Sequence, residues 1–177
     1  KIERNLIIHE TKDNKRYNFY LKADILEELS TTSLAWLPEN LHTEAEGSHN
    51  GNNYIAYTFY AENIGQEPIT YNAEIILDDV IRNMDEALRV LVYKNDEKVV
   101  YAKTSSKTGE PEEGTKAFID DKTVMSERIE NFEVGAVDKY TVVIFIEGND
   151  AECTDALIGG EIGLYMKLTE EKILEPD

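Results

Sequence analysis

Apolar and polar residues alternate with a period of two along several segments of this chain. The first such segment, Tyr54 to Leu77, holds two alternating runs on either side of a turn from Gly65 to Pro68. Strict alternation predicts a β-strand, because successive side chains of a strand point to opposite faces of its sheet. Glycine supplies turn backbone, and proline cannot donate to a central ladder. The segment is therefore predicted to form an antiparallel hairpin.

The same pattern continues through the second half of the chain. Leu88 to Val92 and Val99 to Lys103 flank an Asn95-Asp96 turn, which predicts a second hairpin. Phe132 to Gly148 carries apolar residues on both faces, as a central strand covered on two sides requires. Ile162 to Leu168 alternates again and predicts a final strand.

Other segments predict shorter features. Short helical turns are expected at 23–30 (ADILEELS) and at 83–86, where Asn83 and Glu86 resemble a capping pair. The polar segment 41–53 reads as a loop, and the Ser-, Thr-, Gly- and Glu-rich segment 104–114 as an exposed loop. Short edge strands are expected at 117–119 and 124–125.

These elements together predict an all-β chain. Eight or nine strands with frequent turns and almost no helix are typical of an antiparallel β-sandwich, of jelly-roll or immunoglobulin-like type. A length of 177 residues fits a single domain over 1–177. Within it, residues 1–16 are expected to form an extended N-terminal arm.

Composition narrows the classes of partner. Thirty-six acidic and eighteen basic residues give a net charge of −18, which argues against nucleic acid and anionic membrane surfaces, since both call for basic patches. No apolar run approaches the ~18 residues that a transmembrane helix needs. Cys153 is the only cysteine, so an internal disulfide is excluded, and a small residue packed under a loop is the simpler reading of its role.

One acidic run offers ligands for a metal ion. The run lies directly after the predicted central strand and consists of Glu147, Asn149, Asp150, Glu152 and Asp155. Calcium prefers flexible cages of oxygen ligands, so this run is a candidate calcium site. The spacing does not match an EF-hand loop, and the alternative is an acidic turn in contact with solvent.

A second candidate set, His42, Glu44 and His49, lies in the segment 41–53. Imidazole and carboxylate are zinc ligands, but a zinc site needs three or four of them to converge. A solvated loop is the alternative. His9-Glu10 lacks the second histidine of a zinc-protease helix, since Asp13 stands four residues after His9. No catalytic residue or cofactor other than calcium is predicted.

The segment YTFYAENIGQEPITYNAEIIL resembles secreted bacterial matrix proteins of the TasA/camelysin type. The later segment VGAVDKYTVVIFIEGNDAECTDALIGGEIGLYMKL is similar to the closing block of that family. The resemblance implies an exported β-sandwich at the bacterial cell surface or outside the cell, often a fibre subunit of the biofilm matrix. Camelysin members were described as surface metalloproteases, but no zinc motif of theirs matches this chain.

Three functions follow from these observations. The leading hypothesis is a non-catalytic structural or adhesion protein that binds itself or other surface and matrix proteins. The first alternative is a camelysin-like surface metalloprotease, with His42, Glu44 and His49 as candidate ligands. The second is a β-sandwich module that binds calcium or another ligand.

The last expectation concerns assembly. The segment Lys1 to His9, with its apolar run Leu6 to Ile8, is a candidate donor strand for the sheet edge of a neighbouring copy. In an isolated chain it is expected to pair within its own sheet. Because the net charge opposes association until it is screened, a monomer is expected at neutral pH and low salt.

Overall fold

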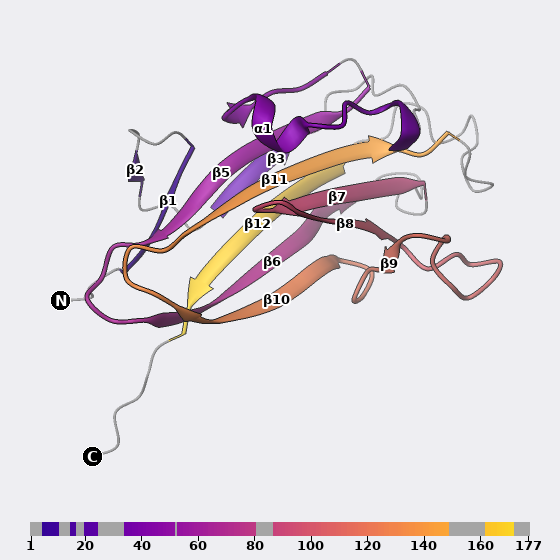
Figure 1. Cartoon of the computed structure of the whole chain (residues 1–177). Helices are drawn as coiled ribbons and strands as arrows, with labels where there is room; N and C mark the ends of the chain where they lie inside the picture. The colour runs from indigo at the N-terminus through magenta and orange to yellow at the C-terminus, as the bar shows by residue number, and fades with distance from the viewer. Residues whose placement is uncertain are drawn as a thin grey trace.

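The computed structural model describes residues 5–10, 15–16, 20–24, 34–51, 53–80, 87–148 and 162–171. Two β-sheets pack face to face over these residues (Figure 1). Helix is limited, in the same residues, to the 3-10 turn η1 (Leu34–Trp36) and the short helix α1 (Leu41–Glu44). The predicted all-β sandwich is therefore confirmed.

The larger sheet is formed by strands from both halves of the chain. Its order is β2 (Lys15–Arg16), β1 (Leu6–His9), β5 (Ile55–Asn63), β11 (Val137–Ile146), β7 (Leu88–Lys94), β8 (Glu97–Ala102) and β9 (Lys116–Ala117), with β4 (Gly47–Ser48) also on β5. The smaller sheet has the order β10 (Thr123–Phe132), β6 (Ile69–Val80), β12 (Ile162–Glu170) and β3 (Tyr20–Asp24). Every pairing is antiparallel except β8 with β9.

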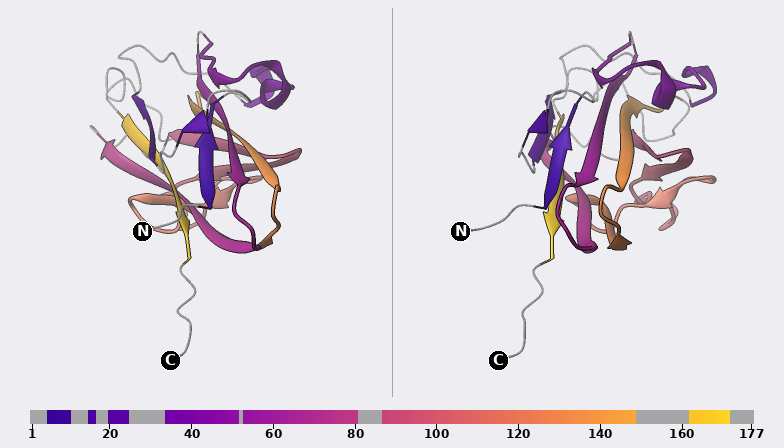
Figure 2. Two further views of the ribbon diagram at one scale, coloured as in Figure 1. Left: turned by 90° about the vertical axis from the view of Figure 1, so that its left-hand side faces the viewer. Right: turned by 60° about the vertical axis from the view of Figure 1, so that its left-hand side comes forward.

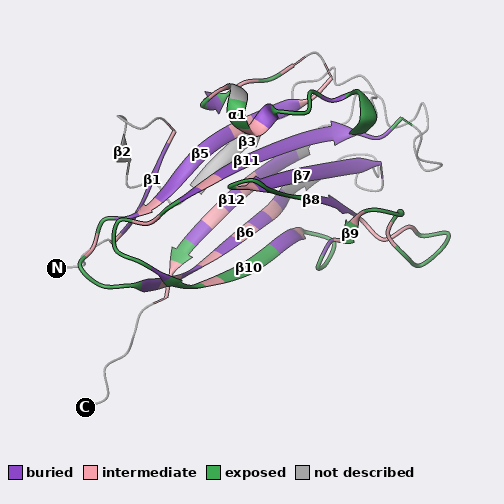
Figure 3. Cartoon of the chain, viewed as in Figure 1, coloured by how far each residue is buried: buried purple, intermediate pink, exposed green. Residues whose placement is uncertain are grey.

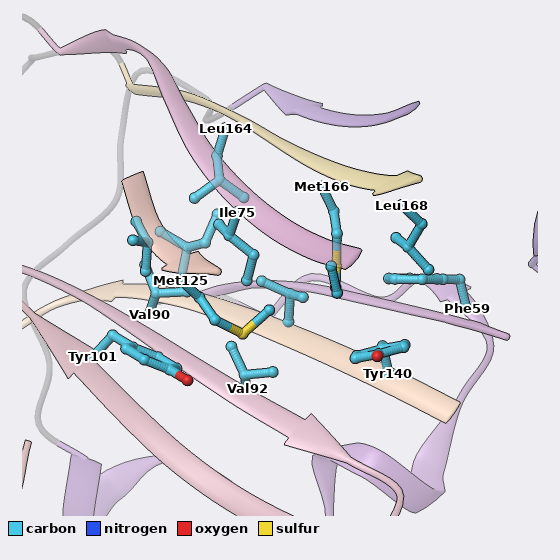
Figure 4. Close-up of a cluster of buried hydrophobic side chains, with 14 of the residues drawn as sticks. Phe59, Ile75, Val90, Val92, Tyr101, Met125, Tyr140, Leu164, Met166 and Leu168 are labelled. Atoms are coloured by element: carbon cyan, nitrogen blue, oxygen red, sulfur yellow. The ribbon is translucent and has the colours of Figure 1, made fainter. Parts of the chain in front are cut away.

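The main core fills the space between the two sheets (Figure 4). Phe59 and Tyr140 of the larger sheet stack with ring centroids 5.3 Å apart, and Met166 and Leu168 of the smaller sheet approach from the other side. Leu168 and Tyr140 are fully buried. Because these residues alternate with outward-facing ones, the period of two in the sequence directly marks the core face.

The predicted hairpin over Tyr54 to Leu77 is wrong in its pairing. Its two strands exist, as β5 and β6, but they belong to opposite sheets: β5 pairs with β1 and β11, and β6 with β10 and β12. Both strands turn an apolar face into the same core, so their alternation is compatible with either arrangement. The outer face of β5 is buried as well: Ala56 and Thr58 are fully buried, and Ala56 belongs to the apolar cluster on that side of the sheet.

Asn63 fixes the crossover between the sheets. Its side chain is fully buried, and its Nδ2 donates to the carbonyl oxygens of Glu67 and Phe132, each at 2.9 Å. Its Oδ1 accepts from the amide of Gly65 at 2.9 Å. A Cβ at Gly65 would lie 2.5 Å from Oδ1 of Asn5, so the turn needs glycine at this position. The polar groups of the bend are thus satisfied inside the protein.

The predictions for β7, β8 and β11 are confirmed. β7 and β8 form a hairpin in which Asn95 adopts a φ of 56°, a value that asparagine tolerates. β11 lies between β5 and β7 and is buried on both faces (Figure 3). Ile144 packs in the main core, whereas Val143 and Phe145 pack on the outer side.

The outer face of the larger sheet has a cover of its own, the η1–α1 layer (residues 34–44) (Figure 2). Two residues of this layer, Leu37 and Leu41, form a second apolar cluster with six residues of the sheet: Ala56, Leu91, Tyr93, Val100, Val143 and Phe145. The loop predicted over 41–53 is therefore wrong in part, because that segment contains α1 and β4. Leu41 is fully buried and holds this segment on the sheet, although the residues around it in the sequence are polar.

The helical turn predicted over 23–30 is contradicted where it can be compared. Ala23 and Asp24 belong to β3 and pair with Leu164 and Gly163 of β12. A helix of eight residues is marginal alone, whereas the edge of β12 offers a complete set of backbone partners. Residues 25–30, the capping pair at 83–86 and Cys153 lie outside the described residues.

Residues 104–114 lie outside any strand or helix, and most of them are exposed. Glu112 of this loop forms an ion pair with Arg89, whose side chain is only 3% exposed on β7. Of the predicted edge strands, the one expected over 117–119 is observed only in part, as β9, which ends at Ala117. The second is β10, which extends over ten residues rather than two at the edge of the smaller sheet.

Candidate functional site

The two histidines of the predicted metal set have different partners. Nε2 of His49 lies 2.8 Å from Oγ1 of Thr58, which in turn lies 2.8 Å from Oγ1 of Thr141. His42 instead stacks on Tyr93 with ring centroids 4.3 Å apart. Its Nε2 is 3.7 Å from a carboxylate oxygen of Asp96, and its Nδ1 is buried without a hydrogen-bond partner.

The remaining metal candidates are only partly visible. The backbone of Glu44 ends α1, and its side chain lies outside the description. Glu147 is 9% exposed, and its amide donates to the carbonyl of Ala87 at 2.9 Å. The other calcium candidates, Asn149, Asp150, Glu152 and Asp155, lie outside the described residues. Within the described part of the chain, no three His, Cys, Asp or Glu side chains are grouped to hold a metal ion.

Strand β1 occupies a well-formed seat in the larger sheet. Its four residues, Leu6 to His9, are between 0 and 4% exposed. They pair with β5 from Asn63 back to Tyr60, and Leu6 and Ile8 enter the main core. On its other side, among the residues that the structure describes, β1 pairs with the two-residue strand β2. We call this position, the strand and its partners on β5, the β1 seat.

Polar groups surround the outer side of the β1 seat. Nε2 of His9 lies 3.5 Å from Oε1 of Glu62, and the imidazole stacks on Tyr60 with ring centroids 5.2 Å apart. Burial and the hydrogen bond to Glu46 raise the pKa of Tyr60. The ammonium group of Lys139 lies 5.7 Å from the same tyrosine ring. The contacts of His9 with Glu62 and Tyr60 hold the outer side of β1, in addition to its apolar burial.

A buried polar cluster joins the two sheets at the start of β11. Tyr71 of β6 donates its hydroxyl proton to Asp138 of β11, and Tyr140 lies within 2.6 Å of the Tyr71 oxygen. Asp138 also accepts from Nδ2 of Asn95 at 3.2 Å. Burial is the main cause that raises the pKa of both tyrosines. Because both tyrosine side chains are fully buried, the cluster holds the sheets together and offers no access to a substrate.

The open side of the sandwich lies between β8 and β9 on one sheet and β10 on the other. A pocket of about 120 Å³ opens there, lined by Tyr101, Lys116, Ala117, Ile119, Val124, Met125, Ser126 and Glu127. Burial and the nearby Glu127 carboxylate raise the pKa of Tyr101. Figure 4 shows Tyr101 and Met125 side by side at this margin of the core. The pocket is small, and both apolar and charged residues line it.

The exposed edge strand β10 is protected by charge and by an irregular backbone. Arg128 donates to the carboxylate of Glu171 at 2.7 and 3.0 Å and also forms an ion pair with Glu130. The bond from Arg128 is the main cause that lowers the pKa of Glu171 to about 2. Asn131 has a φ of 52°, where the register with β6 shifts. Charges and bulges of this kind hinder pairing with another chain.

Sequence reasoning missed three of these features. Asp138 and Arg89 stand among apolar strand residues, and nothing in the sequence distinguishes them from exposed charges. The alternation of the sequence marks Tyr71 and Tyr140 as core positions, but their contact joins strands of two different sheets, and the sequence does not show which strands face each other. The pocket on the open side depends on how the sheet edges meet. Alternation along one strand does not show how the edges of two sheets pack against each other.

Comparisons with known proteins add no functional assignment. No family model matches the chain, and no curated protein matches it. Two solved structures of a β-glucosidase from Kluyveromyces marxianus, one labelled with selenomethionine and one in complex with glucose, are similar to 96% of this chain at 11% and 12% identity. Their TM-scores are 0.34 and 0.33, and the matched region is 17% of each glucosidase chain. Similarity at this level carries no argument about function.

Within the described residues, none of the helices has the length and apolar composition to cross a membrane.

Proposed function

We propose that this chain is a non-catalytic structural or adhesion protein of the bacterial cell surface or extracellular matrix, and that copies of it assemble by exchanging strand β1. The observation that carries the proposal is the β1 seat. Four consecutive side chains are almost fully buried there, yet within the described part of the chain the strand pairs with a long strand on one side and with a two-residue strand on the other. The same seat can accept the same strand from a neighbouring copy, because the contacts are identical.

Charge supplies the condition for assembly. A net charge of −18 keeps copies apart at neutral pH and low salt, so the chain is monomeric there. Near the sequence pI of about 4.5 the repulsion falls, and salt shortens its range. Sedimentation is expected to show monomers at neutral pH and ordered fibres near pH 4.5. Removal of residues 1–9 is expected to abolish the fibres.

A reversible lock tests the exchange without truncation. Ile7 and Glu62 are directly opposite in the β1–β5 register, at a separation that suits a disulfide. We expect Ile7→Cys/Glu62→Cys, in a Cys153→Ser background, to stay monomeric when oxidised at pH 4.5 and to form fibres when reduced. The reduced form of the same variant is the matched control. Fibres from the oxidised or truncated chain, or no fibres under any condition, would show that β1 exchange is wrong.

A further inference from the structure

The only tryptophan of the chain lies on the surface. Trp36 ends the turn η1, and its side chain is 81% exposed. The neighbouring Leu34 is 37% exposed. An aromatic side chain of this size is usually buried, and tryptophan residues are enriched at surface sites that bind partners.

The backbone that carries Trp36 is firmly attached to the larger sheet. Leu37, the next residue, packs with Leu41 against Tyr93 and Phe145 in the outer apolar cluster. The amide of Leu37 donates to the carbonyl of Leu34 at 3.3 Å, which closes the turn. The indole is therefore presented from a fixed position, and little conformational freedom is lost when a ligand covers it.

The chain around Trp36 is strongly acidic. The described stretch that contains Trp36, residues 34–51, has no lysine or arginine and has three glutamates, Glu39, Glu44 and Glu46. Glu39 is exposed three residues after Trp36, and its carbonyl lies 3.5 Å from the hydroxyl of Tyr93. On the adjoining turn, Asp96 is 97% exposed beside His42. Two exposed carboxylates, those of Glu39 and Asp96, therefore border the η1–α1 layer, and they favour a positively charged ligand there.

Two described lysines lie on the same side of the larger sheet. Lys139 lies over the ring of Tyr60, and not over Tyr93, the tyrosine that packs beneath the η1–α1 layer. Lys98 is directly opposite Tyr93 in the β7–β8 register, and Tyr93 packs beneath the η1–α1 layer. Lys98 is thus a described cation that would repel a positively charged ligand at this surface.

We propose that Trp36 and the carboxylates around it form a docking surface for a basic segment of a protein partner. An arginine or lysine side chain of that segment stacks on the exposed indole, where the attraction of a cation for an aromatic face is greatest for tryptophan. Nearby carboxylates, Glu39 first among them, bind the remaining positive charges of the segment. The inference goes beyond the proposed function, because it requires neither fibres nor exchange of β1.

The single tryptophan makes the test direct, since all indole fluorescence comes from Trp36. The probe is a short dye-labelled peptide of alternating Arg and Gly, compared with Glu-Gly and Ser-Gly peptides of equal length. At neutral pH and low salt, the Arg-Gly peptide is expected to change the emission of Trp36 and to gain anisotropy. The other two peptides are expected to do neither. About 0.5 M salt should weaken the binding, because exposed charges are then screened.

Variants separate the indole from general charge attraction. Trp36→Ala is expected to weaken Arg-Gly binding about 2- to 30-fold, and Trp36→Phe by less. Glu39→Gln should also weaken it, whereas Lys98→Glu should strengthen it. Val134→Ala is the matched control, because Val134 is 49% exposed on the turn between β10 and β11, and it should bind as wild type. Since all these side chains are exposed, circular dichroism should show the same fold in each.

Three results would overturn the proposal. Trp36→Ala that binds the Arg-Gly peptide as tightly as wild type would leave charge alone as the cause. A neutral oligosaccharide that shifts the Trp36 emission when the Arg-Gly peptide does not would assign the surface to a carbohydrate. An emission shift with protein concentration alone would assign it to a second copy. The oxidised Ile7→Cys/Glu62→Cys chain should bind the peptide normally, so failure of β1 exchange and failure of this proposal can be told apart.

Discussion

Replacing Tyr71 by phenylalanine is expected to reveal how much the buried polar cluster contributes to stability. The hydroxyl of Tyr71 has one proton, which it donates to Asp138, so the bond between the two tyrosines must use the proton of Tyr140. Tyr71→Phe removes both bonds at once. It leaves Asp138, which is 9% exposed, with Asn95 as its described side-chain donor.

The magnitude follows from the charge of the acceptor. A hydrogen bond to a charged group contributes about 1.5–3 kcal/mol, and a neutral one about 1 kcal/mol. Tyr71→Phe should therefore lower the free energy of unfolding by about 2.5–4 kcal/mol, and Tyr140→Phe by about 1 kcal/mol. The double variant should cost about as much as Tyr71→Phe alone, because both bonds involve the same oxygen.

Urea unfolding followed by far-ultraviolet circular dichroism measures these differences, provided that the slope with denaturant is unchanged. Tyr93→Phe is the matched control. That hydroxyl is also in a buried side chain, but its acceptor is 3.5 Å away, so the loss should stay below about 0.5 kcal/mol. Equal losses for Tyr71→Phe and Tyr140→Phe, or additive losses in the double variant, would refute the assigned directions of donation.

Two further predictions concern the outer cover and the edge strand. Leu41→Ala, at a fully buried position of the η1–α1 layer, should lower the free energy of unfolding in urea by about 2–5 kcal/mol. Leu34→Ala, at a position that is 37% exposed, should lower it by less than about 1 kcal/mol. Equal losses would show that the layer does not bury the outer face of the sheet. The pKa of Glu171 is lowered from 4.5 to about 2, so its ion pair with Arg128 stabilises the fold above pH 4.5 and this stability is lost as the pH falls from 4.5 towards 2. The stability difference between wild type and Glu171→Gln should therefore close over that range and shrink in high salt, and a difference that is independent of pH would contradict it.

The candidate metal residues show where sequence proximity misleads. His42 and His49 are seven residues apart, but one stacks on Tyr93 and the other bonds to Thr58. Proximity along a loop does not fix the direction of side chains once part of that loop becomes α1 and packs on a sheet. The β1 seat, in contrast, was foreseeable, because the apolar run from Leu6 to Ile8 needs a place in a core.

Local patterns in the sequence determined the strands themselves. Alternation around Phe59, Tyr71 and Leu164 marked faces that must be buried, and it did so because side-chain direction in a strand depends only on the backbone period. The two-sided burial of β11 followed from its apolar run in the same way. These features depend on neighbouring residues alone, so the sequence is sufficient to find them.

Only the tertiary structure decided which strands are neighbours. β5 and β6 adjoin in the chain yet lie in opposite sheets, and the buried Asn63 sets the bend between them. The contact of Tyr71 with Asp138 and the exposure of Trp36 also result from the packing of segments far apart in sequence. A core accepts any apolar face that fits it, so alternation fixes which side of a strand is buried, and three-dimensional packing alone selects what buries it.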